Sequence, residues 1–267
     1  LVRWCLERKL AARPLRLRQR LYGSMLRYGT QRALEVFDLS LSLASSALAS
    51  GASAAGRVEA ELRRAIIALE LPPGTRLSEQ EIALKYGVSR QPVREALIAL
   101  AKTRLVDIQP QRGTVVVKFS VRKMMEARFV REAVEVAIVQ QACESFAAQS
   151  RQRISDLLDM QDKAAERDDH ASFQRYDELF HVELAEGVGM PLAWEAIRDI
   201  KAHMDRVCQL TLPGTAVMLA LVEQHRSIMA AIDARDAAQA GIAMRHHLTE
   251  ILRALPKTEA SYPDLFE

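Results

Sequence analysis

The chain has 267 residues, 49% of them apolar, and a formal net charge of +3. This length allows two domains, and the apolar content with an ordinary share of charged residues predicts a globular, soluble protein. The three cysteines are widely spaced without a CxxC pair, which predicts neither a disulfide framework nor a cysteine zinc site. The sequence contains no run of about 18 apolar residues, so we predict no membrane span. We expect a cytoplasmic protein.

Charge is distributed unevenly along the chain. Residues 1–56 contain nine basic and three acidic residues, residues 57–119 eleven and seven, and residues 120–267 seventeen and 24. The three segments therefore carry net charges of +6, +4 and −7. A basic front and an acidic back indicate DNA contact by the N-terminal part. Ordinary surface charge is the alternative interpretation.

The first segment, residues 1–56, is unusual in composition. It is rich in arginine up to about residue 32, and residues 39–56 are almost entirely Leu, Ser, Ala and Gly. A basic stretch before an apolar run imitates a secretory signal, but Glu35 and Asp38 lie at the border between them. We interpret residues 1–56 as a flexible tail. Whether the tail belongs to the native protein stays open.

Residues 74–94 predict a helix-turn-helix. Ser78 and Glu81 have the spacing of a capping box, and Gly87 is placed to end that helix in the left-handed conformation. After a three-residue turn, Ser89 can cap a second helix, which tolerates Pro92 in its first turn. Before the motif, apolar residues at helical spacing predict a packing helix from about residue 57.

The second helix and the segment after it carry the candidate DNA contacts. The helix begins with polar and basic side chains, which suit base edges and phosphates in a major groove. Residues 105–109 precede a turn at Pro110–Gly113, and residues 114–117 after it are β-branched. This pattern predicts a two-stranded wing with Arg112 at its tip. We expect DNA contacts from Arg76, Gln80, Ser89, Arg90, Gln91, Arg94, Arg112 and Gly113.

This stretch resembles a known family. The pattern LPPGTRLSEQEIALKYGVSRQPVREAL, followed by an Arg-Gly wing, is similar to the winged helix of GntR-family bacterial transcription regulators across residues 57–118. The resemblance implies a winged helix-turn-helix domain at 57–119 that binds double-stranded operator DNA. A helix pair with a Gly turn in an unrelated all-α protein is the alternative.

From residue 120 onward the pattern is helical throughout. Helices are predicted at about 121–149, 151–167, 170–186, 191–210, 215–234 and 236–255, with a C-terminal tail at 256–267. The fold class is therefore mainly α, with an N-terminal winged helix-turn-helix and an all-α bundle at 120–255.

Four residues of the bundle do not suit an ordinary apolar core. Asp177 and His181 share one helix face, and His225 and His247 each lie on an apolar stripe of another helix. A buried carboxylate without a partner costs several kcal/mol, which is of the order found for buried polar groups. A shared divalent metal ion would satisfy it. The alternative is a hydrogen bond between Asp177 and His181 beside two unrelated core histidines.

The bundle also resembles a known domain. Arg131-x-x-x-Glu135, Asp177-x-x-x-His181, His225 and His247 follow the pattern of the FCD ligand-binding domain of FadR-type GntR regulators. The resemblance implies that the Asp and three His bind Zn²⁺, Ni²⁺ or Mn²⁺, often with an organic acid, and disfavours an acyl-CoA effector. Arg131 either binds a small carboxylate effector or only pairs with Glu135 at i+4. The other histidines, His170, His203 and His246, are interpreted as surface or outer residues.

These features predict a metabolite-responsive regulator and not an enzyme. We expect a repressor that binds its operator as a homodimer and is released or modulated by a small organic acid at the metal site. One alternative is a metal-dependent hydrolase fused to a DNA-binding head, which the absence of a His-Glu-x-x-His motif disfavours, as does Glu183, which we expect to point away from His181 on the helix. A nucleoid-type protein without an effector is the other.

Overall fold

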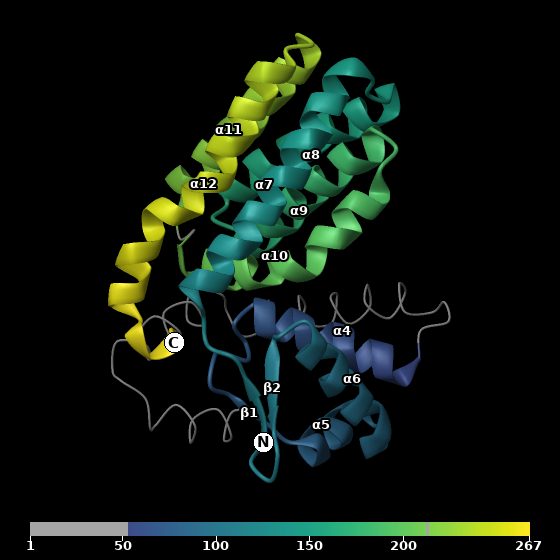
Figure 1. Cartoon of the computed structure of the whole chain (residues 1–267), viewed down its shortest axis with the longest axis vertical. Helices are drawn as coiled ribbons and strands as arrows, with labels where there is room; N and C mark the ends of the chain where they lie inside the picture. The colour runs from purple at the N-terminus through teal and green to yellow at the C-terminus, as the bar shows by residue number, and fades with distance from the viewer. Residues whose placement is uncertain (1–52, 212–213) are drawn as a thin grey trace. The chain divides into compact units, whose positions relative to one another are not determined.

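The computed structural model describes residues 53–211 and 214–267, so the predicted tail at 1–52 lies outside the described residues. The N-terminal part of the described chain is a winged helix (Figure 1). Residues 54–56, which we assigned to the tail, instead form the first turn of its first helix. Its elements are α4 (Ala54–Ile67), β1 (Arg76–Leu77), α5 (Glu79–Tyr86), α6 (Arg90–Lys102), β2 (Val106–Gln109) and β3 (Gly113–Val116).

The wing is a three-stranded antiparallel sheet rather than the predicted hairpin alone. Strands β2 and β3 pair from Val106↔Val116 to Gln109↔Gly113, as the sequence pattern predicts. Strand β1 adds to the other edge of β3, which gives the order β1-β3-β2. A two-residue strand is too short to show an alternating pattern, so the sequence did not predict it.

The helix caps bear out most of the local predictions. The hydroxyl of Ser78 accepts a hydrogen bond from the backbone N–H of Glu81 at 3.3 Å. Gly87 ends α5 with φ of 64°, in the left-handed region that glycine adopts without strain. Ser89 occupies the N-cap position of α6, but its side chain makes no capping hydrogen bond. That hydroxyl is exposed and thus accessible to another partner.

The C-terminal part is the predicted bundle of six helices. Helix α7 lies between α12 and α10 and also contacts α9 and α11, so it is the central helix (Figure 1). The six are α7 (Val121–Glu144), α8 (Ala148–Glu166), α9 (His170–Gly187), α10 (Pro191–Thr211), α11 (Thr215–Asp233) and α12 (Ala237–Ser261).

Two predicted helix ends were wrong. Helix α7 ends at Glu144 and not at 149, because Phe146 turns into space beside Gly187 that a Cβ atom there would occupy. Helix α12 continues through Pro256 to Ser261, where we predicted a tail. The extension is stabilised by a small core that includes Phe119 and Phe266, whose rings meet edge to face. A short helix, η1 (Pro263–Leu265), completes the chain.

The bundle encloses an apolar core built from all six helices, and the winged helix has a second core to which Ala202 of α10 also contributes. Among the described residues, no helix combines the length and the apolarity needed to cross a membrane.

Candidate DNA-binding surface and metal centre

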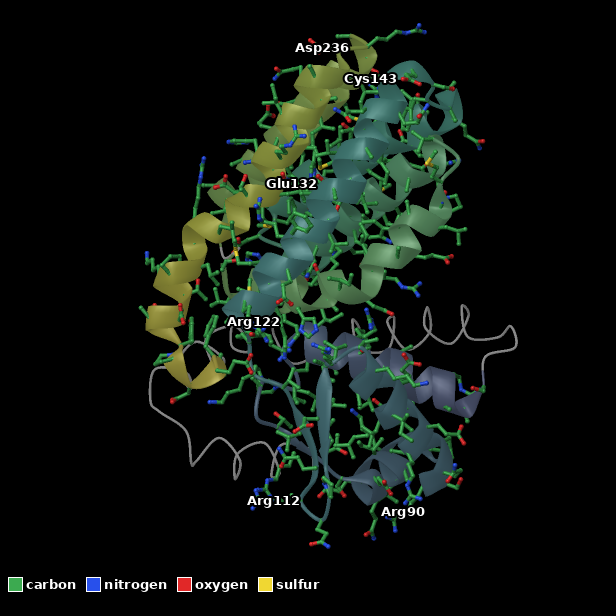
Figure 2. All side chains as sticks on the ribbon, in the orientation of Figure 1. Arg90, Arg112, Arg122, Glu132, Cys143 and Asp236 are labelled. Atoms are coloured by element: carbon green, nitrogen blue, oxygen red, sulfur yellow. The ribbon has the colours of Figure 1, made fainter. Side chains whose placement is uncertain are left out.

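All eight predicted DNA-contact residues are exposed on the winged helix. Arg90 begins α6, and Arg112 lies in the turn between β2 and β3; Figure 2 shows both at the same edge of the winged helix. The turn is tight, since Gln111 and Gly113 both adopt positive φ. This arrangement presents a helix start and a wing tip on one side, as a groove-reading winged helix requires.

Glu79 holds two of these arginines, and the sequence analysis did not single it out. Its carboxylate accepts hydrogen bonds from Arg90 at 2.9 Å and from Arg94 at 3.0 and 3.1 Å. These hydrogen bonds, first that from Arg94, lower the pKa of Glu79. Because Glu79 is in the first turn of α5, it orients basic side chains of α6 before DNA arrives.

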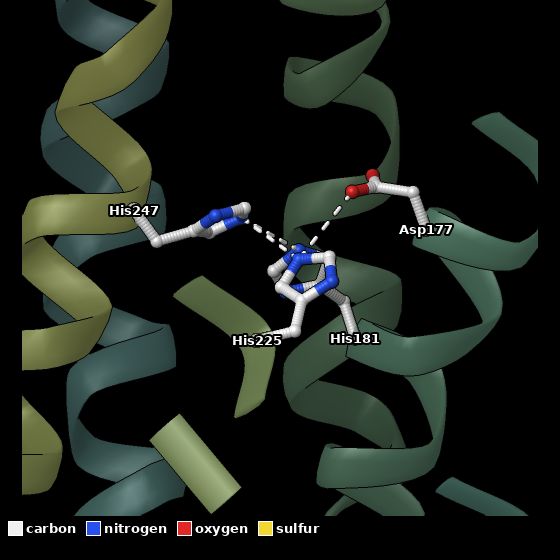
Figure 3. A group of neighbouring side chains, drawn as sticks. All are labelled: Asp177, His181, His225 and His247. Carbon is white, nitrogen blue, oxygen red and sulfur yellow. Dashed lines mark hydrogen bonds and ion pairs between the residues drawn. The ribbon is translucent and has the colours of Figure 1, made fainter. Parts of the chain in front are cut away.

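The four predicted metal ligands converge in the bundle from three helices. Helix α9 supplies Asp177 and His181, α11 supplies His225 and α12 supplies His247 (Figure 3). One ligand atom from each lies within 4.8 Å of the others. The three histidines are buried, and the Asp177 side chain is 22% exposed. The cluster is therefore an interior site with limited access to solvent.

Each imidazole of the cluster has its Nδ1 atom held by a neighbouring oxygen. Gln161 accepts from His225 at 2.8 Å and Gln224 accepts from His247 at 3.2 Å, whereas Oε2 of Glu135 lies 2.5 Å from Nδ1 of His181 as an ion pair without hydrogen-bond geometry. An oxygen acceptor favours the tautomer that carries its proton on Nδ1. All three Nε2 atoms then present lone pairs, which is the arrangement of metal-binding histidines with their outer partners.

The Nε2 atoms face one another at short distances. His247 Nε2 lies 3.2 Å from that of His181 and 3.3 Å from that of His225, and Asp177 Oδ1 lies 3.5 Å from His225 Nε2. With the protons on Nδ1, no hydrogen atom remains to bridge the nitrogens, so their lone pairs repel. Nitrogen atoms bound to one zinc ion at about 2.0–2.1 Å stand roughly 3–3.4 Å apart. The donor set therefore fits a divalent cation.

Aromatic packing fixes the rings. Phe180 stacks on His225 with centroids 4.1 Å apart, and Trp194 lies parallel to His181 at 6.0 Å.

Burial, and after it the nearby imidazoles, hold the pKa of His225 and His247 well below the ordinary value. Both rings are thus neutral and available as ligands at neutral pH.

Glu135 connects the cluster to Arg131 on the same helix. Burial alone would raise the pKa of Glu135, but Arg131 and His181 outweigh it and hold that pKa far below its usual range. The Nε–H of Arg131 donates to Glu135 at 2.6 Å. No partner is found in residues 53–211 and 214–267 for the terminal nitrogens of this buried guanidinium. Arg131 therefore pairs with Glu135 at i+4 through Nε, and its two terminal guanidinium nitrogens stay available for another partner.

A second buried cation lies near the same place. Lys201 of α10 is 2% exposed, and its ammonium pairs with Asp205 at 2.7 Å. Burial opposes its charge, but Asp205 and the acidic groups around it raise the pKa of Lys201. The charges of Arg131 and Asp177 also act on the pKa of Lys201: Arg131 lowers it and Asp177 raises it. The sequence analysis missed this residue because one lysine in a helix has no distinguishing pattern.

Two glutamine partners were also missed, and one of them had a signal. Gln161 is fully buried on the apolar face of α8 that includes Ile154 and Leu158. A polar residue at that position of an apolar stripe predicts a buried hydrogen bond. Gln224, next to His225 in the sequence, has no such signal.

The other histidines lie outside the cluster. His203 donates from Nε2 to the backbone oxygen of Thr103 at 3.2 Å, and burial lowers its pKa to about 4. His170 is partly exposed beside Asp168, and His246 is exposed. None of the three belongs to the cluster of Asp177, His181, His225 and His247.

Comparisons with known proteins match the winged helix and the helical bundle to two separate family models. Residues 54–116 match the model of the bacterial regulatory proteins of the gntR family, and residues 126–250 match the FCD domain. The chain is 35% identical to the HTH-type transcriptional repressor RspR of Escherichia coli over 205 residues, which are 77% of this chain and 90% of RspR. It is 29% identical to the gluconate operon transcriptional repressor of Bacillus subtilis over 57% of this chain and 63% of that protein.

Solved structures show the same fold. E. coli McbR/YncC superposes with a TM-score of 0.68 at 22% identity and covers 79% of this chain and all of that chain. A GntR-type regulator from Rhodococcus sp. RHA1 superposes with a TM-score of 0.66 at 26% identity, over 76% of this chain and 97% of that chain. With a winged helix, a buried Asp/His₃ cluster and these relatives, the chain belongs to the GntR family of transcription regulators and carries an FCD domain.

Proposed function

We propose that this regulator represses transcription as a homodimer and that a small carboxylate, bound at a metal ion in the FCD domain, releases or modulates it. The domain boundaries we propose are 54–119 for the DNA-binding unit, because α4 begins at Ala54 and not at the expected residue 57, and 120–255 for the effector unit, with α12 extending beyond that limit to Ser261. A repressor of this kind acts on DNA in the cytoplasm.

One observation carries the metal site. Three buried imidazoles have their Nδ1 atoms held by oxygens and direct their Nε2 lone pairs to one point beside Asp177. Lone pairs brought together in this way repel, and a cation bound between them would relieve that repulsion; three nitrogens with one carboxylate oxygen suit Zn²⁺, Ni²⁺ or Mn²⁺. The bound ion would supply a Lewis-acidic position for an effector oxygen.

Arg131 supports a carboxylate as the effector. Its Nε is occupied by Glu135, and its terminal nitrogens remain available for a two-pronged contact with an anion. A divalent ion bound here would add its charge to those of Arg131 and Lys201 and offset the carboxylates of Asp177, Glu135, Asp205 and Glu178. An anionic effector would therefore be favoured over a neutral one.

DNA recognition is proposed through the exposed surface of the winged helix. Arg90, Gln91 and Arg94 would enter the major groove, and Arg112 would contact the backbone or minor groove at the wing. Ser89, whose hydroxyl makes no cap bond, is free to contact phosphate. One such head reads only a few base pairs, so two copies on two half-sites are needed for specificity.

A hydrolase with a DNA-binding head finds no support. The matched relatives are named as transcription regulators. Glu183, the nearest acidic residue after His181 in sequence, pairs with Arg153 of α8 at 2.6 Å. Glu135 is already engaged by Arg131 and His181, so neither carboxylate is placed to activate water.

The test is metal content together with regulation. Protein purified without chelators should contain about one divalent ion per chain by elemental analysis, and EDTA should lower its melting temperature. His225→Ala should lose the ion and the response to carboxylates while still binding DNA. His246→Ala is the matched control, because His246 is exposed and next to the ligand His247.

The outcomes separate clearly. Retention of stoichiometric metal in His225→Ala, or a wild-type protein without metal and insensitive to EDTA, would contradict the site. Loss of metal with unchanged response to every carboxylate tested would contradict its role in effector binding.

A further inference from the structure

The linker between the winged helix and the bundle, residues 117–120, is held by a segment far away in the sequence. The N–H of Phe119 donates to the backbone oxygen of Leu265 at 2.9 Å, and the oxygen of Phe119 accepts from the N–H of Glu267 at 3.0 Å. Phe119 and Phe266 form an isolated parallel bridge, and their ring centroids lie 5.1 Å apart. Both backbone groups of Phe119 are therefore paired with the segment that follows α12.

A buried arginine of α10 holds the same linker. Arg206 is fully buried, and its Nη2 donates to the backbone oxygen of Val117 at 2.5 Å. Its guanidinium carbon lies 4.8 Å from the centre of the Phe119 ring, which is a cation–π contact. The N–H of Val117 donates to the backbone oxygen of Leu105 in the winged helix at 3.1 Å. Val117 is thus bonded to the winged helix through its nitrogen and to the bundle through its oxygen.

The charge of Arg206 is unusual for a permanently closed core. Its Nε and Nη1 have no hydrogen-bond partner within residues 53–211 and 214–267, and burial lowers the pKa of Arg206 to about 10. A buried cation without a counter-ion destabilises the arrangement that encloses it, whereas an apolar side chain of the same volume would not. Opening of this contact would return the guanidinium to water. The contact is therefore built to open more readily than an apolar core.

We propose that Arg206 and residues 262–267 form a clasp that closes on the linker and makes the winged helix and the bundle respond as one unit. The apolar core around Phe119 draws residues from α7, α10 and α12, so the clasp depends on how these three helices are placed. Helix α10 also meets the winged helix directly, for example through Arg63 and the exposed carboxylate of Asp199 at 3.0 Å. An exposed ion pair contributes little by itself, so the buried clasp is the stronger connection.

Helix α10 connects the clasp with the candidate metal centre. On this helix Trp194 lies parallel to His181 with centroids 6.0 Å apart, and Lys201 pairs with Asp205 at 2.7 Å. Arg206 follows Asp205 directly in the sequence. A ligand that displaces Lys201 or Asp205 would shift α10 and change the contact of Arg206 with the linker. This step rests on the proposed function and adds the route from its ligand site to the DNA-binding surface.

The first experiment tests whether the clasp couples the unfolding of the two domains. Hydrogen exchange in the full chain, measured by mass spectrometry at increasing urea concentration, follows peptides of α6 in the winged helix and of α8 in the bundle. In the wild type both peptides should lose protection at the same urea concentration. Phe266→Ala should lower that concentration for α6 by about 1 M more than for α8. A general structural defect would instead lower both together.

A second variant breaks the clasp from α10. Arg206→Met fills the same space but removes the hydrogen bond to Val117, the ring contact and the unpaired buried charge. It should separate the two transitions without lowering that of α8. It also decides the question if Phe266→Ala fails to fold. The matched control is Asp264→Ala, which is exposed in the same segment as Phe266 and should behave as the wild type.

The second experiment tests the connection to the metal centre, with Zn²⁺ alone as the probe. Protein freed of metal with EDTA is compared with the same protein after addition of Zn²⁺. In the wild type, Zn²⁺ should slow exchange about tenfold in α9 and α11, which carry ligands, and in the linker peptide 117–121. In Phe266→Ala and Arg206→Met, Zn²⁺ should still protect α9 and α11 but should no longer protect the linker.

Each result decides a separate point. Wild-type α6 and α8 peptides that lose protection at different urea concentrations, or clasp variants in which they stay together, would overturn the clasp. So would an Asp264→Ala variant that separates them equally. No effect of Zn²⁺ on α9 and α11 would overturn the proposed metal site, while the urea experiment still decides the clasp. Protection of α9 and α11 without protection of the wild-type linker, or linker protection that persists in both clasp variants, would overturn the connection between the two.

Discussion

The two functional regions of this regulator are built in opposite ways. On the winged helix, every candidate contact residue is exposed, and Glu79 is the one carboxylate that organises two of them. In the FCD domain, the three candidate histidine ligands are buried and each imidazole depends on an oxygen from another helix. A charged side chain on the surface stays hydrated and has little effect on the free energy of folding. A buried polar group destabilises the fold unless it has a hydrogen-bond or ion-pair partner.

This contrast predicts different consequences for mutation. Substitutions on the DNA surface should change affinity and leave folding intact. Substitutions among the buried groups should change stability first and function as a consequence. The following tests are ordered from the largest expected effect to the smallest.

Glu135→Gln should have the largest effect on stability. Glu135 neutralises the buried Arg131 and holds Nδ1 of His181, and removing one partner of a buried ion pair costs about 3–5 kcal/mol. The free energy of unfolding from urea titration measures the loss. Glu132→Gln, one turn away with a partly exposed carboxylate, is the control and should cost about 1 kcal/mol or less. Equal losses in the two variants would remove the contrast between buried and exposed groups.

His203 should make stability depend on pH. The pKa of about 4 in the folded protein lies below the unfolded value of 6.5, so protons bind the unfolded chain preferentially between these limits. The stability from this group is complete above pH 6.5 and is lost as the pH falls to 4, by roughly 3 kcal/mol. His203→Gln should show a smaller decrease than the wild type in urea titrations at pH 7 and pH 4.5. An unchanged decrease would mean that other groups account for it.

Arg94→Ala should weaken operator binding without unfolding the protein. Loss of a base-specific contact would reduce affinity about 10- to 100-fold, and the side chain is exposed, so thermal stability should not change. Gel-shift titration on an operator mapped by footprinting measures the effect. Lys102→Ala, at the far end of the same helix, should retain wild-type affinity. Comparable weakening in both variants would indicate general charge attraction only.

Arg112→Ala at the wing should have the smallest effect. A phosphate contact contributes to all sequences alike, so the variant should bind specific and non-specific DNA more weakly by a similar factor. The slope of log affinity against log salt concentration should fall by about one. A loss confined to the operator would instead assign base recognition to the wing.

The fold was largely predictable because its signals are local. The Ser78–Glu81 cap, the Gly87 turn and the 3.6-residue periodicity of the bundle each act over a few neighbouring residues. The errors fall where distant packing prevailed. Phe146 ends α7 against Gly187, and the Phe119–Phe266 contact accompanies a helix that continues through Pro256.

The candidate metal site divides in the same way. By itself the sequence determined which residues are candidate metal ligands, because Asp177 and His181 share a helix face and His225 and His247 interrupt apolar stripes. Only the tertiary structure decided what those residues do for one another. Three helices bring the Nε2 atoms together, and Glu135, Gln161 and Gln224 fix their tautomers from positions up to 64 residues away. Periodicity reports which face of a helix is buried, but the partner of a buried polar group depends on how separate helices pack.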